Sequence, residues 1–344
     1  MTSRRTDLVA PVRAISVLLV VAGQLWLVCP FTNIDDVSPL DGFLRSGNLA
    51  IVGLLACSGY VMTRLVTSPP EPRGAMTSMR AGLRSGLTVI PVLVLVCAGV
   101  WVMSLLDSTD SYSSDITRSS LIHVFSFNWN NYVRVHPLGV RSDLAGLWFF
   151  SVEAQLTVAL LVVVVLFRRF RRLLILLVVA GLVFFTWWNF HVFDTKGWFQ
   201  ASLRSDTHVD AVLWGALAAL VCPRLRWTPR TASSAVGCAA LVLVGLVLGA
   251  SYFSLRDFYL GPATLMAFAV SLVLGAAAAS DGAGRLFELA GEEVPVLHDV
   301  GRNWAYAFAV APPVFYALAR NTSDWDNASR LFVALALVAG IIFV

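Results

Sequence analysis

The sequence predicts an all-α, polytopic integral membrane protein with about ten transmembrane helices and a cytoplasmic N-terminus. Hydrophobic residues make up 58% of the 344 residues and charged residues only 13%. A soluble domain carries about 45–50% and about 25%, respectively, and one soluble core cannot bury such an apolar surplus. The composition therefore excludes an ordinary soluble enzyme, a disordered chain and a nucleic-acid binder, and makes the lipid bilayer the first expected partner. The five cysteines are scattered without metal-ligand spacing, so we predict no metal site and no resident cofactor.

Apolar runs close to the ~20 residues needed to cross a bilayer recur along the whole chain. Short polar or Pro-, Gly- and Arg-rich breaks separate them. The first run follows Arg4 and Arg5 and lacks an A-x-A-like cleavage site, so we interpret it as a retained span and not as a signal peptide. The expected spans are residues 9–29, 47–66, 86–106, 147–167, 173–190, 207–222, 232–250, 259–279, 300–319 and 331–344.

Basic residues orient this predicted bundle. With the N-terminus inside, 16 of the 25 Lys and Arg residues lie at cytoplasmic ends, and the positive-inside rule selects this orientation. Residues 1–344 then form a single multi-pass domain of the cell inner (plasma) membrane. Residues 107–146 are its longest soluble segment, an extracytoplasmic loop whose length is compatible with function and with simple solvation. The 16 residues are Arg4, Arg5, Arg13, Arg64, Arg73, Arg80, Arg84, Arg168, Arg169, Arg171, Arg172, Arg224, Arg226, Arg230, Arg285 and Arg302.

Four polar side chains lie within predicted spans or at their outer ends. Gln24 is five residues from the end of the first span and Glu153 is six residues into the fourth, which places both about 7–9 Å below the outer surface. His208 and Asp210 open the sixth span at the same side. Because polar groups inside a bilayer are costly and by default face a functional path, the four predict a site open to the extracytoplasmic side.

Structural roles account for part of this set. Gln24 and Gln155 are typical of interhelical hydrogen bonds worth about 0.6 kcal/mol, and that is our interpretation of Gln155. His208 and Asp210 suit the cap of a helix N-terminus equally well. Glu153 favours function, because an ionised carboxylate at that depth needs a partner or a proton.

Arginines at the cytoplasmic side form a second candidate site. Arg80 and Arg84 are spaced i, i+4 and share a helix face before the third span, and Arg13 stands at the inner end of the first span. The planar guanidinium binds a phosphate through two hydrogen bonds at once. Topological anchoring also predicts arginines at these places. We favour anchoring for residues 168–172, whereas both interpretations stay open for Arg80 and Arg84.

Five stretches carry a resemblance to a known family, and they occur in the family's order. They are RAISVLLVVAGQLW from Arg13, NLAIVGLLACSGYVMTRLV with Ser58, LWFFSVEAQL with Trp148, Ser151 and Glu153, SDTHVDAVLWGALAAL with His208 and Asp210, and VGRNWAYAFAVAPPVF from Val300. This set resembles the acyltransferase-three family of integral membrane O-acyltransferases, which includes bacterial O-antigen and peptidoglycan O-acetylases. The resemblance covers nearly the whole chain.

The resemblance implies that an acyl group moves from cytoplasmic acyl-CoA, such as acetyl-CoA, to a hydroxyl of an extracytoplasmic cell-envelope carbohydrate or glycolipid. By the same resemblance, Arg13 matches the motif arginine and Glu153 matches the signature glutamate. Arg80 or Arg84 loosely matches the basic cluster that meets the phosphates of the donor. Further substrate-binding candidates from the shared motifs are Trp148, Ser151 and Ser58.

The chain departs from the family at Gln24, which stands where the family has its catalytic histidine. A histidine with a pKa of about 6.5 can take a proton from the attacking hydroxyl, whereas a glutamine amide can only hold a carbonyl or donate to an oxyanion. One hypothesis is an active transferase in which His208, supported by Asp210, or else Glu153 supplies the base. The other is a degenerate member that binds an envelope lipid or glycan or scaffolds a membrane protein partner. A transporter is not favoured, because the chain lacks the internal symmetry that transporters often show.

Overall fold

The computed structural model describes residues 9–28, 37–67, 74–106, 110–280, 295–322 and 324–343. Within these ranges every regular element is helical, as the composition predicts. The α-helices are α1 (Val9–Val28), α2 (Pro39–Arg45), α3 (Gly47–Thr67), α4 (Ala75–Gly86), α5 (Ile90–Leu106), α6 (Ser114–Phe125), α7 (Trp129–Val135), α8 (Trp148–Phe167), α9 (Arg171–Leu203), α10 (Val209–Val221), α11 (Pro229–Leu248), α12 (Leu255–Leu260), α13 (Pro262–Ala279), α15 (Pro295–Arg302), α16 (Trp304–Asn321) and α17 (Asn327–Phe343). The 3-10 turns are η1 (Leu87–Val89), η2 (Ser142–Leu147), η3 (Ser205–Thr207), η4 (Cys222–Arg224) and η5 (Ala250–Tyr252).

Seven segments of the described chain are long and apolar enough to cross a membrane. They are Val9–Leu27, Gly47–Thr67, Met76–Leu106, Ser142–Phe167, Arg171–Leu203, Pro229–Leu248 and Pro262–Ala279. The prediction of an all-α polytopic membrane protein is therefore confirmed. Three of the about ten expected spans, 207–222, 300–319 and 331–344, are not among the seven.

Each of the three expected spans that are not among the seven has a local structural cause. The segment 207–222 gives only the 13 residues of α10 between the turns η3 and η4, and 13 residues rise about 20 Å, less than the ~30 Å hydrocarbon core. The segment 300–319 is divided at Asn303, where α15 has ended and α16 has not begun. In α17 the apolar part, Ala328–Leu337, is shorter than a span.

Helix α9 is longer than the expected span 173–190, because it runs for 33 residues to Leu203. Near its end Gly197 has φ 78°, a left-handed conformation that only glycine adopts at little cost. The backbone kinks there, and Ala201 and Leu203 beyond the kink are buried. The end of α9 is thereby held against the bundle, next to η3.

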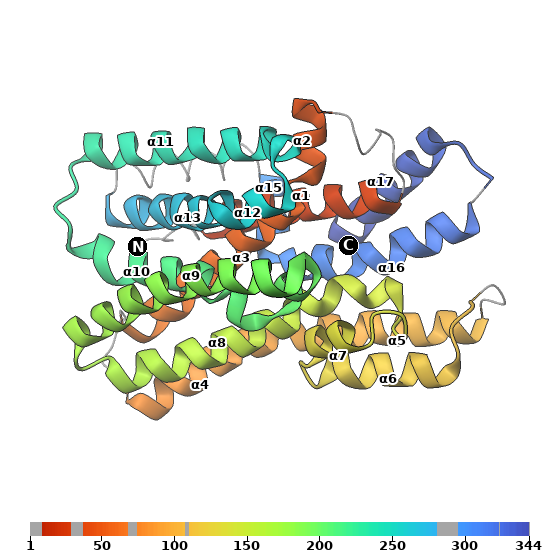
Figure 1. The fold of residues 1–344 in the computed structure, drawn as a ribbon, viewed down its shortest axis with the longest axis horizontal. Helices are drawn as coiled ribbons and strands as arrows, with labels where there is room; N and C mark the ends of the chain where they lie inside the picture. The colour runs from red at the N-terminus through yellow and green to blue at the C-terminus, as the bar shows by residue number, and fades with distance from the viewer. Residues whose placement is uncertain are drawn as a thin grey trace.

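The long helices lie side by side, and α1 ends where α3 and α8 begin (Figure 1). Gly23 near the end of α1 lies against Leu44 and Gly47, at the start of α3. Gly146, just before α8, lies against the side chain of Gln24. We call this end of the bundle, which also carries α6 and α7, the loop end, and the other end the opposite end.

Helices α3 and α10 are in backbone contact through two glycines. An ideal Cβ on Gly215 would lie 1.9 Å from the carbonyl oxygen of Ala56, and one on Gly59 would lie 2.0 Å from that of Val212. Neither position has room for a side chain. Close approach through small residues is common where helices associate in lipid, and here it fixes α10 in the interior of the bundle.

Replacing Gly215 with alanine is expected to lower the thermal stability. The new methyl group would push α3 and α10 apart at a cost of about 1–3 kcal/mol, more than the ~1 kcal/mol gained in helix propensity. Gly237→Ala on α11 is the matched control, because nothing lies within 4 Å of its ideal Cβ. Thermal unfolding of the purified protein in detergent should show a lower Tm for Gly215→Ala alone, and equal Tm values would contradict the close contact.

The described part of the expected loop, 110–146, is folded into α6, α7 and η2 around Arg141, which is 1% exposed. The Nε and Nη2 atoms of Arg141 donate to Asp143 at 3.0 and 2.7 Å, and Nη1 donates to Asp110 and to Thr117, each at 2.9 Å. The guanidinium also lies 4.8 Å from the centre of the Tyr112 ring. Charge-assisted, bidentate bonds of this kind fix geometry, so the segment forms an ordered cover on the loop end.

Candidate active site

Glu153, on α8, interacts with residues of the two helices α3 and α1. The Ser58 hydroxyl donates to Glu153 Oε1 at 2.5 Å, and the Arg13 guanidinium interacts electrostatically with the same carboxylate. Arg13 in turn lies 5.6 Å from the centre of the Trp304 ring on α16. These partners offset part of the cost of placing a carboxylate inside the bundle. We call Glu153, Ser58, Arg13 and Trp304 the Glu153 cluster.

A cavity of about 800 Å³ lies at the loop end, and Gln24 is one of its lining residues. We call it the Gln24 cavity. The Oε1 atom of Gln24 is buried and has no hydrogen-bond partner among the described residues, which leaves an acceptor for a ligand or a water. The aromatic residues of the wall are Trp26, Trp148, Trp198, Phe199, Phe253, Phe258, Tyr259 and Tyr316.

His208 lies directly behind the wall of this cavity. Its ring is stacked on that of Trp148 with 5.6 Å between the ring centres, and the residue is only 6% exposed. His208 Nε2 lies 2.9 Å from the carbonyl oxygen of Ser202, which also lines the cavity. Because a carbonyl only accepts, Nε2 carries the hydrogen, and in the neutral ring Nδ1 keeps the lone pair that can take a proton.

Asp210 is buried in the first turn of α10. Its carboxylate accepts hydrogen bonds from the Thr264 side chain and from the backbone of Ala211. An acidic residue that accepts backbone N–H groups in the first turn of a helix is typical of helix capping. None of the interactions that Asp210 makes with the described residues is with His208. The geometry therefore supports the interpretation that Asp210 caps the helix.

The structure divides the predicted outer-face residues into two groups. Gln24 and Trp148 line the same cavity, and His208 stacks on Trp148. Glu153 is not among the lining residues and is associated with Arg13 instead. Arg13 and Gln24 are eleven residues apart, about 16 Å along α1, so the Glu153 cluster lies deeper in the bundle than the cavity.

Two further residues of the fourth-span motif are occupied by contacts within the protein. Ser151 is 1% exposed and its hydroxyl accepts the backbone N–H of Trp129 at 3.1 Å. Gln155 Nε2 donates to the carbonyl of Phe127 at 2.7 Å and to Asn130 Oδ1 at 3.1 Å. Gln155 therefore connects α8 to α7, in keeping with the predicted interhelical role.

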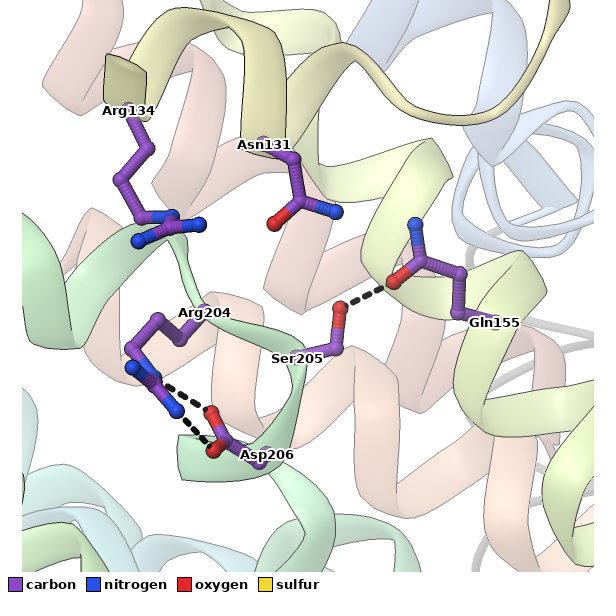
Figure 2. A pocket seen from close by; sticks show the side chains of 6 residues that line it. All are labelled: Asn131, Arg134, Gln155, Arg204, Ser205 and Asp206. Carbon is purple, nitrogen blue, oxygen red and sulfur yellow. Dashed lines mark hydrogen bonds and ion pairs between the residues drawn. The ribbon is translucent and has the colours of Figure 1, made fainter.

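A second pocket, of about 240 Å³, lies between α7, α8 and η3, and sequence reasoning missed it (Figure 2). We call it the polar pocket. Its polar residues come from three separate segments, and the only signal in the sequence was the density of Asn and Arg in the expected loop and just before the sixth expected span. The pocket is lined by Asn131, Arg134, Gln155, Arg204, Ser205 and Asp206.

An ion pair forms one wall of the polar pocket. Arg204 Nε and Nη2 donate to the two carboxylate oxygens of Asp206 at 2.8 and 2.5 Å, and Trp188 Nε1 donates to Asp206 at 3.0 Å. Burial acts to raise the pKa of Asp206, but the hydrogen bonds from Arg204 and Trp188 outweigh it and lower the pKa. The carboxylate is therefore ionised at neutral pH and its charge is matched by that of Arg204.

Wherever they are among the described residues, the arginines that we expected at the cytoplasmic side lie at the end of the bundle away from the loop end, which we named the opposite end. Arg80 and Arg84 are both exposed on α4. Arg64 Nη1 donates to the Tyr60 hydroxyl at 2.9 Å, and Arg171 donates to the carbonyl of Leu220. These last contacts fit helix anchoring. Arg4, Arg5, Arg73 and Arg285 lie outside the described residues.

Residues 12–344 match the Acyltransferase 3 family, whose description is an acyltransferase domain. The match covers nearly the whole chain, including the Glu153 cluster, the Gln24 cavity and the polar pocket. No curated protein and no solved structure matches the chain.

Proposed function

Because this chain belongs to the Acyltransferase 3 family, we propose that it transfers an acyl group from cytoplasmic acyl-CoA, acetyl-CoA in the simplest case, to a hydroxyl of an extracytoplasmic envelope glycan or glycolipid. Membership makes the chain a multi-pass membrane acyltransferase. The donor, the acceptor, the inner-membrane location and the sidedness are our proposal. The observation that carries it is the Gln24 cavity, where the position resembling the family's catalytic histidine meets a space of ligand size.

The Gln24 cavity is the proposed acceptor site. Its volume of about 800 Å³ lies within the ~300–1,000 Å³ of typical ligand pockets. The rings of Trp148 and Tyr316 offer flat apolar surfaces to a sugar ring or a lipid chain, and the Gln24 amide supplies a polar group that fixes orientation. With the N-terminus inside, this cavity belongs to the extracytoplasmic half of the protein.

In the proposed reaction the acceptor hydroxyl attacks the carbonyl carbon of the thioester. A C–O bond forms, the C–S bond breaks, and a base carries the hydroxyl proton to the departing thiolate. Gln24 Nε2 can donate to the carbonyl oxygen as negative charge develops there, but an amide cannot take the proton. We assign the proton to Nδ1 of His208, which stacks on a wall residue of the cavity, with the Glu153 carboxylate as the alternative base.

Arg80 and Arg84 are the proposed contacts for the phosphates of the donor. Both guanidiniums are exposed on α4, and neither makes a hydrogen bond or ion pair among the described residues. They stand one helical turn apart, so one diphosphate can bridge them. In the proposed orientation this end faces the cytoplasm, where acyl-CoA is present.

A second candidate function is a catalytically degenerate member that binds an envelope lipid or glycan, or scaffolds a membrane protein partner. One observation favours it: the polar group presented by Gln24 is an amide whose Oε1 is unpartnered among the described residues. Such a group suits binding without proton transfer. Glycan or lipid binding in the cavity without any acyl transfer would select this function.

Acyl transfer is expected to depend on one of the two candidate bases, His208 or Glu153. Purified protein in liposomes, supplied with radiolabelled acetyl-CoA and envelope glycan fractions, should label an acceptor. Substituting the base should lower the rate about 10²-fold or more, because a general base contributes about 10²- to 10⁴-fold. The affected variant is His208→Ala if His208 Nδ1 takes the proton, and Glu153→Gln if the Glu153 carboxylate does. Matched controls are His191→Ala and Asp115→Asn, both exposed and outside either site. Unchanged rates in both site variants would contradict these roles.

A further inference from the structure

The polar pocket opens beside the Gln24 cavity but is a separate space. Val133 and Leu203 line the Gln24 cavity, and the residues that follow them, Arg134 and Arg204, line the polar pocket. The ends of α7 and α9 therefore form a wall with one space on each side.

Side chains from opposite sides of the polar pocket face one another. Figure 2 shows Arg134 and Asn131 of α7 on one side, Arg204 and Asp206 on the other, and Gln155 of α8 beside Ser205. The Ser205 hydroxyl donates to Gln155 Oε1, so these two residues form a wall that is already hydrogen-bonded. The guanidinium groups of Arg134 and Arg204 therefore remain available to a ligand.

Both arginines keep unused donors. Arg204 uses Nε and Nη2 for Asp206, which leaves the two N–H groups of Nη1 unpaired among the described residues. Arg134 uses Nη1 for Gln200 at 3.2 Å, and its Nε is buried with no hydrogen-bond partner in the described part of the chain. Leaving a buried donor without a partner is unfavourable, so these N–H groups favour a ligand that accepts hydrogen bonds.

The net charge of the pocket indicates the charge of the ligand that it binds. Two guanidiniums and one carboxylate line it, which gives a surplus of one positive charge. Planar guanidinium donors match the oxygens of a carboxylate or a phosphate. Among the described residues, the Asn131 amide uses only Nδ2, which donates to Asn128 at 2.9 Å, so its Oδ1 can accept a hydrogen bond from a sugar hydroxyl.

We propose that the polar pocket binds the oxyanion of an acidic saccharide, a sugar that bears a carboxylate or a phosphate, and so selects an acidic glycan as the acceptor. The selection of an acceptor rests on the proposed function, whereas the binding of the oxyanion does not. The neutral part of the glycan then extends into the Gln24 cavity, where the acceptor hydroxyl stands.

The test is direct binding to the full chain in lipid nanodiscs, without any acyl donor. The probes are glucuronic acid, glucose 6-phosphate, inorganic phosphate and neutral glucose, titrated calorimetrically. We expect the two acidic sugars to bind at least tenfold more tightly than glucose. Tighter binding of glucuronic acid would identify a carboxylate as the natural group and tighter binding of glucose 6-phosphate a phosphate. Binding of inorganic phosphate as tight as that of both sugars would overturn the saccharide part of the proposal.

Substitutions in the polar pocket test whether the acidic sugars bind there. Arg134→Gln and Asn131→Asp should each weaken binding of the acidic sugars at least tenfold, the first by removing a donor and the second by adding a like charge. Arg118→Gln is the matched control, because Arg118 is exposed on α6 and its substitution makes the same change of charge as Arg134→Gln outside the pocket. The Tm of each variant shows whether it has folded, and the two variants remove binding in unrelated ways. Unchanged binding in a folded Arg134→Gln and a folded Asn131→Asp would overturn the proposal.

The two proposals fail in different ways. Acidic sugars that bind to a protein without acyl transfer would contradict the proposed function and leave the oxyanion site standing. Acyl transfer that proceeds equally to neutral and acidic glycans, together with no binding of the acidic sugars, would contradict the oxyanion site and leave the proposed function standing.

Discussion

Replacing Gln24 with histidine is expected to raise the rate of acyl transfer about 10²- to 10⁴-fold. The new imidazole would line the cavity itself, whereas His208 stands behind Trp148. A base in direct reach of the acceptor hydroxyl takes its proton without rearrangement of the wall. The rate should then rise with pH through about pH 6–7, as the imidazole loses its proton and becomes a base. Initial rates from labelled acetyl-CoA, measured across this range, provide the check.

The matched control is Asn48→His, which places an imidazole on another wall of the same cavity. Position matters if the site is correct, so Asn48→His should leave the rate near that of the wild type. Equal gains from both substitutions would mean that any imidazole in the cavity suffices. No gain from Gln24→His would contradict the assignment of position 24 to the reacting groups.

Replacing Arg141 with methionine is expected to destabilise the protein by about 3–5 kcal/mol, the usual cost of removing one partner from a buried charge network. Arg141 is the shared partner of Asp110 and Asp143, whose side chains are 3% and 13% exposed. Methionine keeps much of the volume and removes the charge, so both carboxylates lose their strongest donor. Thermal or denaturant unfolding in detergent should show the loss.

Arg118→Met on α6 is the control for this substitution, because Arg118 is exposed and lies on the same segment. Its unfolding should match that of the wild type within about 0.5 kcal/mol. The variant Arg141→Lys should fall between the two, since an ammonium keeps the charge but not the bidentate geometry. A stability of Arg141→Met equal to that of Arg118→Met would contradict the role of Arg141 as the centre of the loop end.

The fold class followed from composition alone, because few chains other than membrane bundles are so apolar. The length of each helix did not, and α10 shows why. Its sequence is as apolar as a span, but its 13 residues are enclosed by other helices, and hydropathy does not distinguish contact with lipid from contact with protein. Buried helices of 10–14 residues are a known exception to span counting.

The candidate site was predicted in part. The helical rise predicted one level for Gln24 and Glu153, but only Gln24 lines the Gln24 cavity, whereas Glu153 belongs to the Glu153 cluster. It could not show that the Glu153 carboxylate is engaged by Ser58 and Arg13, because side-chain reach is not encoded in residue spacing. The polar pocket depends on the kink of α9 at Gly197 and on the folding of residues 110–147, neither of which has a periodic signal in the sequence.

The proposed function requires that this chain move an acyl group across the bundle to an acceptor held in the Gln24 cavity. The most direct test uses wild-type protein of known orientation in sealed vesicles, with labelled acetyl-CoA on one side and an envelope glycan on the other. Labelled glycan is expected only when acetyl-CoA is on the side of α4 and the glycan is at the loop end. Wild-type protein that labels no glycan in either arrangement, while Gln24→His does, would contradict it and identify a degenerate, binding member of the family.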